Sequence, residues 1–482
     1  MHRRIESAMT MMTDPRHFKL RLFIEGNIIG VATGMVIALF RYLLELSEEY
    51  LPVLYLWLPE HIVWIPVWFL ALFLCSWVLY RIVRKDGMTS GSGIPQIKGI
   101  LLGEMDMNWA RVLVLKFTGA VLGIGAGMSL GREGPSVQLG ACLGQGLGRL
   151  THRSYAESHY LLTAGAGAGL AAAFNAPLAG VIFCLEELTK NFSAFVLMGA
   201  ISAAVTATTV TQYFFGMQPV FHMGVVPVID TGHMYFLLIL LGAFVGLLGL
   251  AFNPMLTRSQ DFYKKVPARW RPVVPLFCVG ILGFVLPQVL GGGSRLVDSL
   301  VVTDYTLAFL VLLLAAKFLF TMVCFGSGVP GGIFLPMLVL GSVGGAVFAK
   351  VAIFFQWMPE LFAVNCIVFG MAAYFSAVVK SPITGSVLIM EMTGSFEHML
   401  ALIIVSMTAY LVSDLTGGAP VYDMLLARSL AVRKKIASRI RHRRVLLELS
   451  VGVKSALDGR TVASALWPSG CVLVNVRRGP HE

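Results

Sequence analysis

Two acidic residues stand inside long apolar stretches of this sequence, where charge is costly. Glu133 lies in "GREGPSVQLG", between glycines and a proline, and Glu187 lies in "FCLEELT" beside Glu186. An ionisable residue within a membrane span is by default a functional residue, often one that carries protons. The alternative for Glu133 is a helix cap paired with neighbouring Arg132. The alternative for Glu187 is a solvated pair with Glu186 at the end of a span.

The loop around Glu133 predicts an anion site at the start of a helix. Gly131 and Gly134 permit a tight backbone, and Pro135 suits the first turn of a helix. The free N–H groups of such a helix start bind anions, helped by the helix dipole. The Glu133 carboxylate and a small anion would compete for these N–H groups, so protonation of Glu133 would be linked to anion binding.

Two further stretches have the same character, "GSGIP" at 91–95 and "GSGVPGGIFLP" at 326–336. Ser92 supplies a hydroxyl donor in the first stretch, and Ile333 and Phe334 begin a helix in the second. We expect three helix starts to converge on a pocket with many donors and little fixed positive charge. Such a pocket suits a small monovalent anion that must bind and leave, whereas a phosphate or dicarboxylate would require Arg or Lys clamps. The expected loop residues are Gly91, Gly93, Ile94, Pro95, Gly131, Arg132, Gly134, Pro135, Gly332 and Pro336.

The composition is that of a polytopic helical membrane protein. The chain of 482 residues is 57% hydrophobic and 13% charged, whereas a soluble domain carries about 25% charged residues. Several apolar runs have the length of a membrane-spanning helix, about 20 residues. They include 27–46, 62–83, 109–130, 233–257, 305–325 and 398–416.

An internal repeat divides the apolar region into two halves. "GREGPSVQLG" at 131–140 matches "GIFLPMLVLG" at 332–341, and "APLAGVIFCLEE" at 176–187 matches "SPITGSVLIMEM" at 381–392. The second match pairs Glu186 with Glu391 but Glu187 with Met392. Paired segments interrupted by Gly and Pro are the best sequence indication of a transporter's mid-membrane site. We expect halves of roughly 25–215 and 232–430.

The ends of the chain are basic and account for much of the net charge of +11. By the positive-inside rule both termini are expected in the cytoplasm. The basic stretch at 427–444 is interpreted as an orientation signal that also contacts anionic lipids, with no nucleic-acid role. We expect residues 1–24 to form a cytoplasmic N-terminal segment, and 431–482 a basic linker with a partial small regulatory domain. No GxxxxGK[ST] or HExxH motif occurs, so we expect no enzymatic activity, cofactor or metal.

Four ordered motifs, "GSGIP", "GREGP", "GGIFLP" and "VYDMLLAR", give residues 25–430 a clear resemblance to the CLC family of chloride channels and chloride/proton antiporters. The resemblance implies an all-α membrane protein with two inverted halves and many tilted, broken helices. It also implies a homodimer with one anion pathway in each subunit. It further implies that the hydroxyls of Ser92 and Tyr422 and the backbone N–H groups of Ile333 and Phe334 bind chloride.

The same resemblance implies that Glu133 is the external gating glutamate and Glu187 the internal proton-transfer glutamate of the antiporter branch. We therefore expect a chloride/proton antiporter of the bacterial cytoplasmic membrane. The alternative is a passive voltage- or pH-gated chloride channel. Gln96 and Lys98 depart from the bacterial antiporter pattern, in which acids are common at both positions. The usual acidic neighbour of Lys116 would stand at 98, so we expect altered electrostatics there.

Overall fold

The computed structural model describes residues 15–436 except 218, 225, 230, 231 and 395, together with 461, 462 and 464. Of the linker and regulatory domain expected over 431–482, the described part of the chain includes only 431–436, which end the last described helix, and those three residues. The expected boundary at residue 25 falls inside the first described helix, which begins at Pro15. Two compact units are separated near residue 440, and everything below concerns the first.

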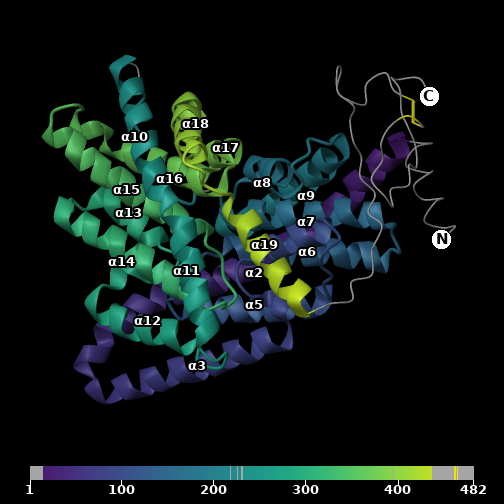
Figure 1. The fold of residues 1–482 in the computed structure, drawn as a ribbon, viewed down its shortest axis with the longest axis horizontal. Helices are drawn as coiled ribbons and strands as arrows, with labels where there is room; N and C mark the ends of the chain where they lie inside the picture. The colour runs from purple at the N-terminus through teal and green to yellow at the C-terminus, as the bar shows by residue number, and fades with distance from the viewer. Residues whose placement is uncertain are drawn as a thin grey trace. The chain divides into compact units, whose positions relative to one another are not determined.

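The first half of the fold contains eight described α-helices, several of them short (Figure 1). Their starts follow local rules: Asn108 caps one through its side chain, and Ser154 and Glu157 form a reciprocal capping box at another. The helices are α2 (Pro15–Trp57), α3 (Ile65–Lys85), α4 (Ile94–Leu101), α5 (Trp109–Gly125), α6 (Glu133–Leu150), α7 (Tyr155–Phe174), α8 (Pro177–Phe183) and α9 (Ala194–Phe215).

The second half repeats this order of long and short helices and is followed by one further helix. In Figure 1 the helices α10 to α16 group to the left, α6 to α9 lie to the right, and α19 lies between them in this view. The helices are α10 (Gly232–Leu250), α11 (Phe252–Lys265), α12 (Val273–Val285), α13 (Ser294–Val302), α14 (Leu307–Gly326), α15 (Phe334–Phe354), α16 (Ala363–Val379), α17 (Pro382–Thr393), α18 (Met399–Leu415) and α19 (Val421–Ile436).

Within the described residues, eight helical segments are long and apolar enough to cross a membrane. They contain or overlap five of the six apolar runs predicted from the sequence, and the sixth run, 109–130, forms α5 and the loop after it. Between them lie short helices such as α4, α8, α13 and α17. Backbone that is interrupted at membrane depth survives only where protein or a water-filled cavity satisfies its polar groups. The residues that begin α4, α6 and α15 are accordingly buried.

The two halves repeat each other in their packing as well as in their sequence. On α6 and α7, a Cβ added to Gly140 would lie 2.0 Å from the Gly165 carbonyl oxygen. On α15 and α16, a Cβ added to Gly341 would lie 2.4 Å from the Gly370 carbonyl oxygen. Small residues allow membrane helices to approach this closely. The predicted repeat is therefore confirmed at the level of helix contacts.

The mate of the Ser92 loop in the second half is the segment 291–295, "GGGSR". Gly91 and Gly93 have φ of 64° and 98°, and Gly291 and Gly293 have φ of 62° and 100°. Helices α4 and α13 follow these two loops. The sequence echo between "GSGIP" and "GSGVP" therefore does not mark repeat mates, because "GSGVP" belongs to the connection between α14 and α15.

Candidate functional site

The loops that precede α6 and α15 are hydrogen-bonded to each other. Gly131 N–H donates to the Gly332 carbonyl at 2.8 Å, and Gly332 N–H donates to the Gly131 carbonyl at 2.7 Å. Gly131 and Gly332 are the first residues of the two repeated motifs, so the repeat mates meet face to face. The starts of α6 and α15 are thereby held side by side, although about 200 residues separate them.

The Glu133 side chain reaches from the start of α6 to the start of α15. Its Oε2 accepts a hydrogen bond from Leu335 N–H at 3.3 Å, and its buried Oε1 has no hydrogen-bond partner among the described residues. The first N–H groups of a helix have no acceptor within that helix, so the carboxylate occupies donors that an anion could use. The Arg132 side chain instead pairs with Glu45, with 3.4 Å between Nη1 and Oε1. Glu133 is therefore not paired with Arg132, as the alternative interpretation of the sequence required.

The Ser92 loop joins the same junction. Gly331 N–H donates to the Gly91 carbonyl at 3.0 Å, and a Cβ added to Gly134 would lie 2.4 Å from Ser92 Oγ. Ile94 and Pro95 begin α4, and Pro135 and Pro336 lie in the first turns of α6 and α15. The predicted convergence of three helix starts is therefore present in the structure.

Two hydroxyl groups near these helix starts are buried without a partner. Neither Ser92 Oγ nor Tyr422 Oη has a hydrogen-bond partner in the described part of the chain, and the two residues are 2% and 0% exposed. Ile333 and Phe334, where α15 begins, are fully buried as well. Buried polar groups nearly always have partners, and both hydroxyls are free to donate a hydrogen bond to a ligand.

A buried lysine lies beneath each of the two mate loops. Lys116 Nζ donates to the Thr89 carbonyl at 3.1 Å and also to the Gly91 carbonyl. Lys317 Nζ donates to the Val289 and Gly291 carbonyls at 2.9 and 2.8 Å. Lys116 thus has backbone carbonyls as partners, in keeping with the expectation that position 98 no longer supplies an acid. Sequence reasoning missed Lys317, although its position 201 residues after Lys116 was a usable signal.

Glu186, which follows α8, caps the start of α17. Its repeat mate Glu391, which lies on α17, caps the start of α8. Glu186 accepts from Ile383 N–H at 3.2 Å and from Thr384 N–H at 2.6 Å, at the start of α17. Glu391 accepts from Leu178 N–H at 3.1 Å and Ala179 N–H at 2.7 Å, at the start of α8. Carboxylates are favoured at these ends by the free N–H groups and the helix dipole. Glu186 is therefore engaged with α17 and is not half of a solvated pair.

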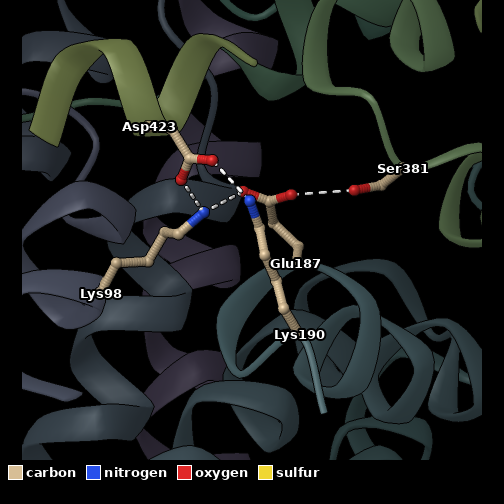
Figure 2. A network of polar contacts seen from close by, with 5 residues as sticks. All are labelled: Lys98, Glu187, Lys190, Ser381 and Asp423. Carbon is tan, nitrogen blue, oxygen red and sulfur yellow. Dashed lines mark hydrogen bonds and ion pairs between the residues drawn. The ribbon is translucent and has the colours of Figure 1, made fainter. Parts of the chain in front are cut away.

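Glu187 lies in the π-helical turn Cys184–Leu188 after α8 and is buried in a network of charges (Figure 2). Its Oε1 accepts from Lys98 Nζ at 2.7 Å and its Oε2 accepts from Ser381 Oγ at 2.9 Å. Lys98 also pairs with Asp423, which pairs in turn with Lys190. The sequence analysis singled out Lys98 and Glu187 but did not predict their contact, because the members of the network come from α4, the π-helical turn and its following loop, the start of α17, and α19.

The network becomes more exposed from Glu187 outward. The exposed fractions of the side chains are 2% for Glu187, 5% for Lys98, 35% for Asp423 and 53% for Lys190. Asp423 belongs to α19, after the last candidate span. Partial burial opposes its ionisation, but hydrogen bonds from Lys190 and Lys98 outweigh that effect and lower the pKa of the Asp423 carboxyl. The network thus connects a buried carboxyl with a surface lysine.

Comparisons with known proteins agree with this architecture. The family model for the voltage gated chloride channel matches residues 71–414. The chain is 37% identical over 430 residues to the H(+)/Cl(-) exchange transporter ClcA of Vibrio cholerae serotype O1, a match that covers 84% of this chain and 89% of the relative. It is 35% identical over 427 residues to the ClcA exchanger of Citrobacter koseri, covering 86% and 89%.

Solved structures have the same fold. The structure of a slow cyanobacterial Cl-/H+ antiporter matches with a TM-score of 0.81 and 30% identity, over 86% of this chain and 99% of the other. A CLC-type fluoride/proton antiporter matches with a TM-score of 0.71 and 24% identity, over 84% and 97%, which shows the shared fold alone. The resemblance stated from the sequence is confirmed: this chain is a multi-pass membrane protein of the voltage-gated chloride channel family, the CLC family.

Proposed function

We propose that the protein exchanges chloride for protons across the bacterial cytoplasmic membrane. Curated relatives at 35–37% identity are named H(+)/Cl(-) exchange transporters, and a solved relative at 30% identity is described as a Cl-/H+ antiporter. These names favour coupled exchange over the passive channel that the family also includes.

Chloride binds where the starts of α4, α6 and α15 converge. In this proposal Ser92 and Tyr422 donate their hydroxyls, and Ile333 and Phe334 donate their backbone N–H groups. The unpaired state of the two buried hydroxyls supports this assignment. A site made of neutral donors holds a monovalent anion without the tight grip of Arg or Lys clamps, so the ion is able to leave.

Glu133 is the gate of this pathway, and the contact between Glu133 and α15 is the observation that carries the proposal. Its carboxylate accepts from Leu335 N–H at the helix start that an anion would otherwise occupy. A chloride ion and an ionised Glu133 compete for these donors. A protonated Glu133 has no charge and binds the same donors much more weakly. Chloride occupancy and proton occupancy are therefore linked at this residue.

Glu187 carries protons between the aqueous side and the interior. Its burial and its connection through Lys98 and Asp423 toward the surface support this role.

The working assembly is a homodimer in the membrane, with lipids around it, both termini in the cytoplasm and no cofactor or nucleic-acid partner. Chloride and protons are its substrates.

Transport by purified protein in liposomes tests the proposal. A chloride gradient is imposed without a proton gradient, the potential is set with valinomycin and potassium, and the external pH is recorded. Coupled exchange predicts that chloride movement drives protons against their own gradient. Chloride flux with no coupled proton movement would identify a channel and overturn the proposal.

A further inference from the structure

Lys98 binds two acidic side chains, Glu187 and Asp423, which are linked to different steps of the proposed transport. Its Nζ donates to Glu187 Oε1 at 2.7 Å and also forms an ion pair with Asp423 (Figure 2). Glu187 is the proton-carrying residue of the proposed function. Asp423 directly follows Tyr422, whose hydroxyl is assigned to chloride, in α19.

Helix α19 packs on α4, so the ion pair between Lys98 and Asp423 joins neighbouring surfaces. A Cβ added to Gly99, next to Lys98, would lie 3.2 Å from Leu426 Cδ1 on α19. Lys98 is only 5% exposed, and a buried charge is strongly destabilising unless it is paired. The Lys98 ammonium group is therefore held between two carboxylates because they neutralise its charge.

We propose that Lys98 is a positioning residue that couples the charge on Glu187 to α19 and its chloride hydroxyl, an inference that rests on the proposed function. The network of Lys98, Lys190, Glu187 and Asp423 has no net charge when all four residues are ionised. A proton on Glu187 leaves the network with one net positive charge and weakens the bond from Lys98 to Glu187. Lys98 then belongs to Asp423 alone, and the excess positive charge favours an anion beside Tyr422.

Other charged and polar groups of the described residues also lie near Glu187, among them the Tyr422 hydroxyl. Ser381 Oγ donates to Glu187 Oε2, and Lys190 bonds to Asp423. Glu186, the neighbour in the chain, is turned to the start of α17. At the start of α7, Glu157 pairs with Arg21, and the His159 ring is tilted against the Tyr155 ring with the ring centroids 4.2 Å apart. Lys98 is therefore the cation that balances the Glu187 carboxylate directly.

The pH profile of coupled proton transport in proteoliposomes tests the inference with two opposed substitutions. Lys98→Met removes the cation that favours ionised Glu187, so the midpoint of the profile should move to higher pH, by about 1 to 3 units. Asp423→Asn leaves Lys98 to Glu187 alone and removes a negative neighbour, so the midpoint should move to lower pH. Lys98→Arg should restore most of the wild-type profile, because the charge is kept.

Lys350→Met serves as the matched control, since Lys350 pairs with Asp304 in a more exposed position away from this network. Opposite shifts for Lys98→Met and Asp423→Asn, with no shift for Lys350→Met, support the inference. Coupled transport with an unchanged midpoint in both network variants would overturn it and leave the proposed function intact. If Lys98→Met does not fold, the downward shift in Asp423→Asn decides the question. Absence of coupled transport in the wild-type protein would instead overturn the proposed function.

Discussion

Gly131 and Gly332 donate a backbone hydrogen bond to each other, at 2.8 and 2.7 Å, across the junction of the two halves. They are equivalent residues of a duplicated sequence, so each half contributes the same position to this contact. It brings the starts of α6 and α15 together and gives Glu133 on one half access to the free donors of the other. The gate proposed here is thus a consequence of the duplication.

Substitution of Glu133 by Ala should separate chloride movement from proton movement. The variant lacks both the carboxylate that competes for the α15 donors and the group that takes up the proton. Chloride flux should therefore persist and lose most of its pH dependence, while coupled proton transport falls to background. A chloride electrode and a pH electrode in the same proteoliposome assay measure both. Retention of proton coupling in Glu133→Ala would contradict the assigned role.

Removal of the unpaired hydroxyls should weaken chloride binding at little cost in stability. Ser92→Ala and Tyr422→Phe break no hydrogen bond within the described residues, so neither variant leaves a protein group without its partner. A hydrogen bond to a charged ligand contributes about 1.5–3 kcal/mol, so each variant should raise the chloride dissociation constant about tenfold or more.

Titration calorimetry of chloride measures this change. Ser342→Ala is a suitable control, because its buried hydroxyl donates to the Val339 carbonyl at 2.8 Å and takes no part in the proposed site. An unchanged dissociation constant in both Ser92→Ala and Tyr422→Phe would show that chloride binds elsewhere.

The two exchanged helix caps predict a matched pair of stability losses. Glu186→Ala leaves two N–H groups and the Thr384 hydroxyl at α17 without their acceptor, and Glu391→Ala leaves two N–H groups at α8. Loss of a helix cap costs about 0.5–2 kcal/mol. Thermal unfolding in detergent should show a lower midpoint for both variants, with the larger loss for Glu186→Ala. Exposed Glu360 provides the control substitution, and equal midpoints for all three variants would be inconsistent with the capping role.

Much of this architecture was predictable from the sequence because duplication leaves a mark that survives divergence. Gly131 with Gly332 and Glu186 with Glu391 were matched by residue pattern and spacing. The structure brings the first pair together at one junction and places the second pair at the starts of α17 and α8. The similarity of "GSGIP" and "GSGVP" correctly indicated two further loops at this junction, although the two loops are not repeat mates.

The network around Glu187 was beyond the reach of sequence reasoning. Lys98 and Glu187 are 89 residues apart, and Asp423 is more than 200 residues further along the chain. Only the packing of α4 against α19 and the π-helical turn brings them together. The sequence did indicate that position 98 carries a lysine where an acidic partner of Lys116 is usual. This observation located the altered electrostatics but did not identify Glu187 and Asp423 as the carboxylates that bind Lys98.

The most direct test of the account records chloride and proton fluxes simultaneously in proteoliposomes with wild-type protein and with Glu187→Ala. The account predicts that the wild-type protein moves protons uphill at the expense of the chloride gradient, and that Glu187→Ala moves chloride alone. Chloride flux without proton movement in the wild-type protein, or undiminished proton coupling in Glu187→Ala, would contradict it.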